Sequence, residues 1–321
     1  MRQSGFTRRA VLGSGVALAA APARAADRIR VAKAVVSSFP FAGLELGKEQ
    51  GFWAAEGLDI EIIAFAGDGR MQQAFGAGGI DFGVGSGPGM GYAAKGVPAR
   101  AIAALAGEPR NMAIVVTHNS PVKTVDDLKG RTVGVTTAGA LTDWLTRRLA
   151  VDRGWGPDGI EITPLGDIRA RLAAMKSGEL AASVNSIEEA LSVQERGEGR
   201  MLLTLGDTVP DFHTHVIFAS DAMIKKSPDV VRRFLRAWFR VAVFMRDNKE
   251  AAIKSVARTM NVSETVVAAA YPDEVRMLSY DGAFSTKALD VIRASLKDLG
   301  IVYFRPEIAQ MLTTDFSPIK P

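Results

Sequence analysis

The sequence has no cysteine, only three histidines among its 321 residues, and no apolar run long enough to cross a bilayer. Without cysteine the chain can form neither a disulfide framework nor a lipid anchor on a cysteine side chain. The longest apolar stretch near the start, residues 10–21, is well short of the ~20 residues that span a bilayer. These absences exclude a disulfide-stapled scaffold and a membrane-spanning protein.

The chain also has little excess charge once its first residues are set aside. The net charge is +4, but residues 1–25 hold four arginines and no acidic residue, so the remainder carries 35 basic and 35 acidic side chains. A neutral body has no basic patch for a phosphate backbone, so we expect no nucleic-acid partner. With 47% hydrophobic and 23% charged residues, the composition is that of a globular protein of about two domains.

The N-terminal segment has the pattern of an export signal. Arg8 and Arg9 precede the apolar stretch, and Ala23 to Ala25 form a small-x-small cleavage site. We therefore predict a signal peptide over residues 1–25, exported by the twin-arginine route, and a mature chain that starts at Ala26. The prediction places a soluble, unlipidated protein in the periplasm.

From residue 27 the pattern alternates short β-like runs with helical stretches, which is typical of α/β architecture with mainly parallel sheets. The same alternation restarts after residue 121, and the chain from residue 228 onward is mostly helical. We predict strands at residues 29–36, 58–65, 80–84, 99–105, 131–136, 160–164, 181–184, 201–205 and 216–219.

Several motifs, taken in order, resemble one known family. The segments are residues 51–60, 78–88, 127–135, 171–180 and 216–220. Together they resemble the sulfonate, nitrate and taurine family of solute-binding proteins of ABC transporters, a family that also includes binders of thiamine pyrimidine precursors. The resemblance covers nearly the whole mature chain and rests on the order and spacing of the motifs.

The resemblance implies a two-lobed periplasmic-binding-protein fold of type II, with a ligand cleft between two mainly parallel sheets flanked by helices. We assign residues 26–112 and 220–321 to the first lobe and residues 113–219 to the second, with crossings near residues 110–117 and 218–222. The implied partners are a small-molecule ligand and an inner-membrane ABC permease. We expect a monomer without cofactor or metal.

Small polar residues follow several of the predicted strands, where α/β folds hold ligands. Such residues are also common in ordinary β–α turns and at helix starts, so no one segment is specific. As a group they form the candidate ligand site: Ser37, Ser38, Phe39, Gly67, Asp68, Gly69, Arg70, Gly85, Ser86, Gly87, Thr136, Thr137, Ala138, Gly139, Ala140, Asn185 and Ser186.

The helix start at residues 137–142 is the strongest candidate for an anionic group, because small side chains leave backbone amides accessible there. Arg70, beside a glycine turn, is the candidate cation, and Asp68 could neutralise it or bind a ligand amine. We expect a sulfonate, taurine, nitrate or a similar organic anion as the ligand.

Three alternatives stay open. The chain could bind a thiamine pyrimidine precursor, or it could report to a receptor instead of a permease. It could also be an exported enzyme on the same fold with Glu188 or His213 as acid or base, although we find no catalytic motif. A zinc site at His213 and His215 would need further ligands.

Overall fold

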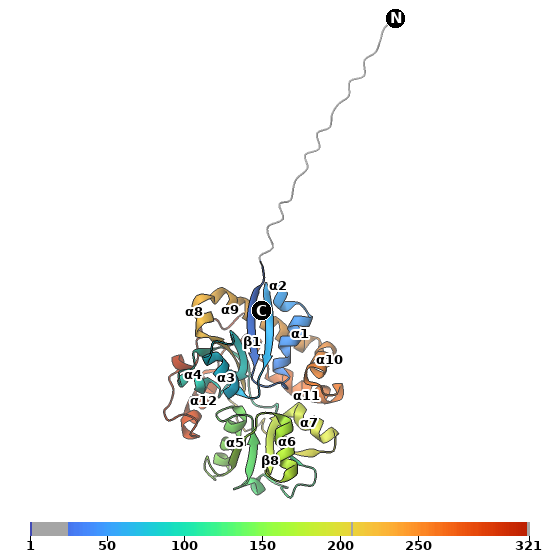
Figure 1. Ribbon diagram of the computed structural model, residues 1–321, viewed down its shortest axis with the longest axis vertical. Helices are drawn as coiled ribbons and strands as arrows, with labels where there is room; N and C mark the ends of the chain where they lie inside the picture. Colours follow the sequence, from blue (N-terminus) through green and yellow to red (C-terminus); the bar gives the residue numbers. More distant parts are fainter. Residues whose placement is uncertain (2–24, 207, 320–321) are drawn as a thin grey trace.

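A computed structural model describes residues 1, 25–206 and 208–319 and shows two five-stranded sheets, one in each of two stacked lobes (Figure 1). The predicted α/β fold with two lobes is confirmed. The signal peptide predicted over residues 1–25 lies, apart from its two end residues, outside the described residues.

The sheet of the first lobe combines parallel strands with one returning strand. β1 (Asp27–Lys33) lies parallel to β2 (Leu58–Ala64) and β3 (Phe82–Ser86). β10 (His215–Ser220) lies between β3 and β4 (Ala99–Ala106) and is antiparallel to both. The strand order is β2-β1-β3-β10-β4.

The second sheet repeats this arrangement. β6 (Thr132–Val135) lies parallel to β7 (Glu161–Pro164) and to β8 (Ala182–Ser186). β5 (Met112–Thr117) lies antiparallel to β8 and to β9 (Gly199–Thr204). The strand order is β7-β6-β8-β5-β9.

The positions predicted for the two crossings are wrong. Residues 112–117, expected to cross between the lobes, form β5 inside the second sheet, and β10 belongs to the first sheet from His215 onward. The crossings therefore lie between β4 and β5 and between β9 and β10, and the Thr214 amide joins them by donating to the Gly107 carbonyl at 2.9 Å. A central strand is an apolar run whichever sheet it enters, so local sequence could not tell the two sheets apart.

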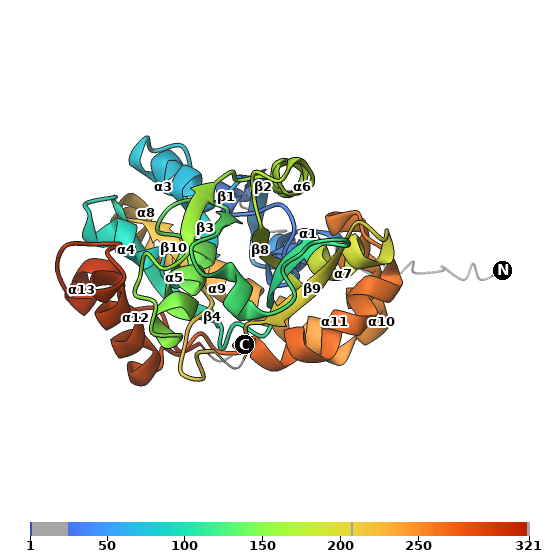
Figure 2. The same cartoon turned by 90° about the horizontal axis from the view of Figure 1, so that it is seen from below.

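Helices flank both sheets, and Figure 2 shows them from below. In the first lobe, α9 (Pro228–Asp247) packs on α1 (Gly43–Glu49) and α2 (Phe52–Ala55). The Trp53 ring of α2 stacks on Phe234 with centroids 5.2 Å apart. A 3-10 turn, Val125–Leu128, precedes β6 in the second lobe. The remaining helices are α3 (Asp68–Gly76), α4 (Met90–Ala94), α5 (Leu141–Asp152), α6 (Ile168–Ser177), α7 (Ile187–Glu195), α8 (Asp221–Lys226), α10 (Lys249–Met260), α11 (Glu264–Met277), α12 (Thr286–Asp298) and α13 (Ile308–Met311).

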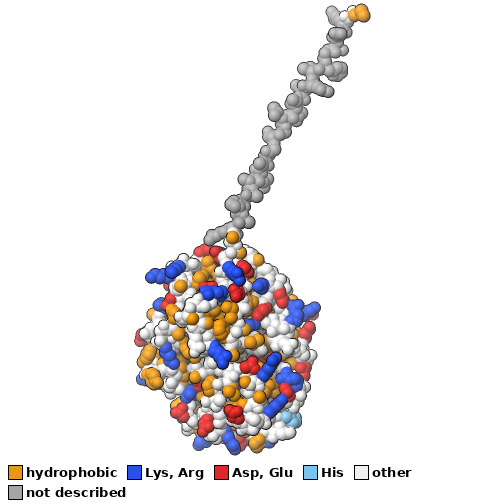
Figure 3. All heavy atoms as spheres, viewed as in Figure 1, with side chains coloured by type: hydrophobic (Ala, Val, Ile, Leu, Met, Phe, Trp, Pro, Cys, Tyr) orange, Lys and Arg blue, Asp and Glu red, His pale blue; other side chains and the backbone are white. Residues whose placement is uncertain are grey.

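The visible surface intersperses basic and acidic side chains and shows no large patch of one sign (Figure 3). In the part of the chain that the structure describes, no helix has both the length and the apolar character to cross a membrane.

Candidate functional site

A cavity of about 750 Å³ lies between the two lobes. Both lobes supply its walls, and most of the polar residues among them follow strand ends or begin helices, as predicted for α/β folds. Seven of the predicted site residues line it: Ser37, Ser38, Asp68, Ser86, Thr136, Asn185 and Ser186.

On the first lobe, Asp68 begins α3 and turns its carboxylate toward the end of β3. Its Oδ1 accepts the Ser86 amide at 2.9 Å, and the Ser86 hydroxyl accepts the Gly89 amide at 3.0 Å. A Cβ on Gly85 would lie 2.6 Å from Asp68 Oδ1, so only glycine leaves room for this carboxylate. Burial raises the pKa of Asp68, although its hydrogen bonds to Ser86 act in the opposite direction.

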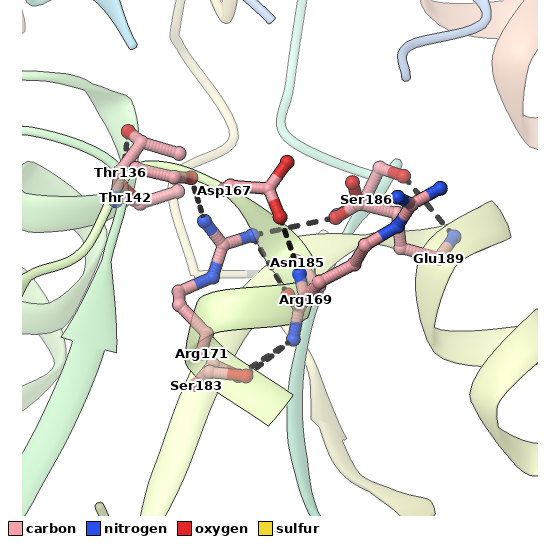
Figure 4. Close-up of polar contacts among 10 residues, drawn as sticks. Thr136, Thr142, Asp167, Arg169, Arg171, Ser183, Asn185, Ser186 and Glu189 are labelled. Atoms are coloured by element: carbon pink, nitrogen blue, oxygen red, sulfur yellow. Dashed lines mark hydrogen bonds and ion pairs between the residues drawn. The ribbon is translucent and has the colours of Figure 1, made fainter. Parts of the chain in front are cut away.

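On the second lobe, the buried guanidinium of Arg171 is the centre of a polar network (Figure 4). It donates to the Gly166 carbonyl and to Asn185 Oδ1, the latter at 3.0 Å, and lies 3.5 Å from Glu189 Oε2. Asn185 in turn donates to the hydroxyl of Ser183 at 2.7 Å. Burial lowers the pKa of Arg171 and raises that of Glu189, while the attraction between the pair opposes both shifts. Arg171 thus holds three segments of the cavity wall together.

A second arginine of α6, Arg169, also lines the cavity but is exposed. Its backbone amide donates to the N-cap Asp167 at 2.8 Å. Its guanidinium forms no ion pair or hydrogen bond among the described residues, and none is drawn at it in Figure 4. Of the two arginines, Arg169 is therefore the one whose charge is free to meet a ligand.

The remaining predicted residues do not line the cavity. Phe39 is fully buried in the core, where its ring meets Tyr271 edge-on at 5.9 Å, and Arg70 is exposed outside the cavity. The others absent from its walls are Gly67, Gly69, Gly85, Gly87, Thr137, Ala138, Gly139 and Ala140.

The prediction that backbone amides stay open at residues 137–142 is wrong at two positions. The Gly139 amide donates to Asp143 Oδ2 at 2.6 Å, and the Ala140 amide donates to the Thr137 carbonyl at 3.2 Å. Since the protein itself uses these donors, they cannot bind an anion without breaking a native hydrogen bond.

The loop of residues 137–139 instead joins the two lobes. Gly69 of the first lobe donates its amide to Thr137 Oγ1 at 3.1 Å, and Tyr92 donates its hydroxyl to the Ala138 carbonyl. Burial raises the pKa of Tyr92 to about 12, which keeps that donor protonated. Gly67, with φ of 119°, packs directly against Thr137, where a side chain would collide. The lobes are therefore in contact along this edge of the cavity.

Sequence reasoning missed both arginines and several other lining residues. The signal for Arg171 was its place on the same helical face as Ile168 and Met175, since a basic residue on such a face points inward. Also missed were Asn111, Glu189 and His215, whereas Thr142, which ends the predicted segment 137–142, does line the cavity.

The residues suggested for an exported enzyme are poorly placed for catalysis. Glu188 is fully buried and does not line the cavity. His213 lies at a smaller hollow of about 290 Å³, where its Nε2 accepts the Ser285 amide at 2.9 Å. Burial lowers its pKa to about 4, and no group of three or more metal-ligating side chains occurs among the described residues.

Comparison with solved structures identifies the class of fold. The alkanesulfonate-binding protein SsuA from Xanthomonas axonopodis pv. citri, solved with MOPS bound, superposes with a TM-score of 0.75 at 18% identity over 90% of this chain and 97% of that chain. The desulfurization enzyme DszB superposes with a TM-score of 0.62 at 17% identity over 90% and 97%. The chain therefore has the two-lobed periplasmic-binding-protein fold, which a binder and an enzyme share.

The sequence then gives the family. The NMT1/THI5-like family profile matches residues 38–252, and the chain belongs to this family. The riboflavin-binding protein RibY from Chloroflexus aurantiacus is 25% identical over 219 residues, which are 67% of this chain and 61% of RibY. The match thus covers less than two thirds of the length of that relative.

Proposed function

We propose that this protein is the periplasmic solute-binding component of an ABC importer and that it holds a small organic anion between its lobes. The observation that carries the proposal is a cavity lined by both lobes in which Arg169 has a guanidinium free of partners among the described residues. A cation at the rim of a cavity attracts an anion and can hold a carboxylate or sulfonate bidentately.

The size and lining of the cavity favour an anion with an apolar body. Its volume of about 750 Å³ lies within the ~300–1,000 Å³ range of pockets for drug-sized ligands, which is more room than nitrate or taurine needs. The first lobe contributes apolar groups, among them Val36, Phe41 and Phe65, while the second contributes Thr136, Asn185 and Ser186. SsuA, which binds alkanesulfonates, makes an organic sulfonate the first choice, and RibY makes a flavin the second.

We infer binding without chemical conversion. Asp68 is buried and Glu189 partly buried in the cavity wall, and they are held by Ser86 and Arg171 respectively. Closure of rigid lobes about the two crossings requires only that the ligand contact both walls.

The test is a ligand panel read by thermal shift and then by calorimetry. The panel holds benzenesulfonate, 2-naphthalenesulfonate, MOPS, taurine, nitrate, riboflavin and the hydroxymethylpyrimidine precursor of thiamine. A ligand at 100 times its Kd adds about 2.7 kcal/mol of stability. Native mass spectrometry of protein purified from its own periplasm would weigh any solute it carries.

The Arg169→Gln variant tests whether Arg169 binds the anion. Loss of a charge-assisted hydrogen bond of about 1.5–3 kcal/mol should weaken the best organic anion roughly 10- to 150-fold. Arg131→Gln, which removes the same charge from an exposed position of the second lobe away from the cavity, should leave affinity unchanged. The proposal of an anionic ligand would be rejected if only riboflavin or the pyrimidine bound, or if Arg169→Gln and Arg131→Gln bound the best anion with equal affinity.

A further inference from the structure

Two carboxyl side chains meet deep inside the junction between the lobes. Glu188 lies on α7 and Glu274 on α11, both are fully buried, and their carboxyl groups interact directly. Figures 1 and 2 both show α7 and α11 side by side. Neither carboxyl serves the binding site proposed above.

The two helices belong to different lobes. α7 packs on β5, β8 and β9 of the second sheet. The end of α11 is tied to the first lobe, because the Gly107 amide donates to the Met277 carbonyl at 2.7 Å and the Ser279 amide donates to the Leu105 carbonyl at 2.8 Å. A movement of one lobe relative to the other therefore acts on the contact between the two carboxyls.

In the described part of the chain, the groups around the pair provide no compensating cation. Asn111 Nδ2 of the first crossing lies 3.5 Å from Glu274 Oε2 and 3.5 Å from His215 Nε2 of β10. Ser186, the N-cap residue of α7, faces Glu188, and the acidic neighbours are Glu189 of α7 and Asp273 of α11. Among the described residues neither carboxyl forms an ion pair.

Two buried carboxylates side by side cannot both be ionised, so the pair retains one proton. The positions of the two residues in their helices determine which carboxyl holds this proton. Glu188 lies in the first turn of α7, where the helix dipole favours an anion, and Glu274 lies in the last turn of α11, where it does not. Burial raises the pKa of both carboxyls. The pKa of Glu274 is raised well above its ordinary value, and after burial the largest cause is the charge of Glu188.

We propose that the Glu188–Glu274 pair is a proton-binding site that couples closure of the two lobes to pH. With the proton in place, a carboxyl-to-carboxylate contact bridges α7 and α11. Without it, two adjacent negative charges repel each other in a low dielectric and favour the open arrangement, in which water reaches them. This inference goes beyond the proposed function and holds whichever ligand the cavity binds.

The direction of the pH effect follows from the raised pKa values. The bridge is complete below the ordinary pKa of glutamate, about 4.3, and is lost as the pH rises through the raised value in the closed state. One proton changes the ratio of closed to open protein at most tenfold per pH unit. Neither buried histidine nearby produces the effect above pH 5, because burial lowers the pKa of His215 to about 3 and that of His213 to about 4.

The experiment measures closure directly, without ligand. Because the chain has no cysteine, Gln73→Cys on α3 and Ala170→Cys on α6 give two unique labelling sites on exposed helix positions of opposite lobes. Spin labels on this pair report the distance between the lobes. We expect a shorter distance at pH 5.5 than at pH 9.

Glu188→Gln with Glu274→Gln should remain closed at both pH values, because two carboxamides can bridge without a proton. Glu250→Gln with Glu264→Gln, which removes two exposed carboxyls, should follow the wild-type pH response. A wild-type distance that does not change with pH, or a double Gln variant that still opens at pH 9, overturns the inference. Since no ligand is present, this failure is distinct from failure of the ligand panel.

Discussion

Replacing Arg171 with Met tests whether the network in the second lobe supports the fold of the cavity wall. Arg171 is 2% exposed, and its guanidinium joins the Gly166 carbonyl, Asn185 Oδ1 and Glu189 Oε2. Met has a similar length and fills the space, but it brings no donor and no charge. The change therefore removes the polar contacts and largely keeps the packing.

The expected loss follows from what stays behind. Glu189 becomes a partly buried carboxyl without its cation, and two oxygen acceptors lose their donors. Breaking a buried pair by removing one partner reduces the free energy of unfolding by about 3–5 kcal/mol. At roughly 2 °C per kcal/mol for a chain of this size, the melting temperature should fall by about 6–10 °C.

Thermal unfolding by circular dichroism without ligand measures the effect, with exposed Arg131→Met as the control. Adding Glu189→Gln to Arg171→Met should restore about half of the loss, because the orphaned carboxyl is then neutral. A single variant within 1 kcal/mol of wild type, or a double variant no more stable than the single one, would refute the assigned role of Arg171.

Apart from β5, which was expected to be a crossing, the order of the strands was predictable because each βα unit has its own local pattern. The polar residues at strand ends, such as Ser38, Ser86 and Asn185, were predictable for the same reason, since parallel strands place their carboxyl ends at one edge. The sheet that β5 joins and the sheet that β10 joins were not predictable, because strand pairing depends on contacts between residues far apart in the chain.

The anion site was the least predictable part. A small residue at a helix start indicates that an amide could be free, but whether it is free depends on tertiary partners such as Asp143, which accepts from Gly139. Arg70 and Arg171 likewise cannot be distinguished by residue type, because only the fold buries one and exposes the other.

Two glycines give the remaining predictions. Gly85→Ala should destabilise the protein by about 1–3 kcal/mol in chemical denaturation, because the new Cβ displaces Asp68. Gly76→Ala, which has open space around it, should not destabilise the protein. Equal stabilities of the two variants would contradict the position assigned to Asp68. Gly67→Ala should hold the lobes apart, because its backbone, at φ of 119°, suits glycine and its Cβ would collide with Thr137 across the lobe contact. The matched control is Gly78→Ala, which also has a positive φ of 70° but open space, so it carries backbone strain without touching the other lobe. Small-angle scattering should therefore give a larger radius of gyration for Gly67→Ala alone, and identical radii for the two variants would show that the contact with Thr137 does not hold the lobes closed.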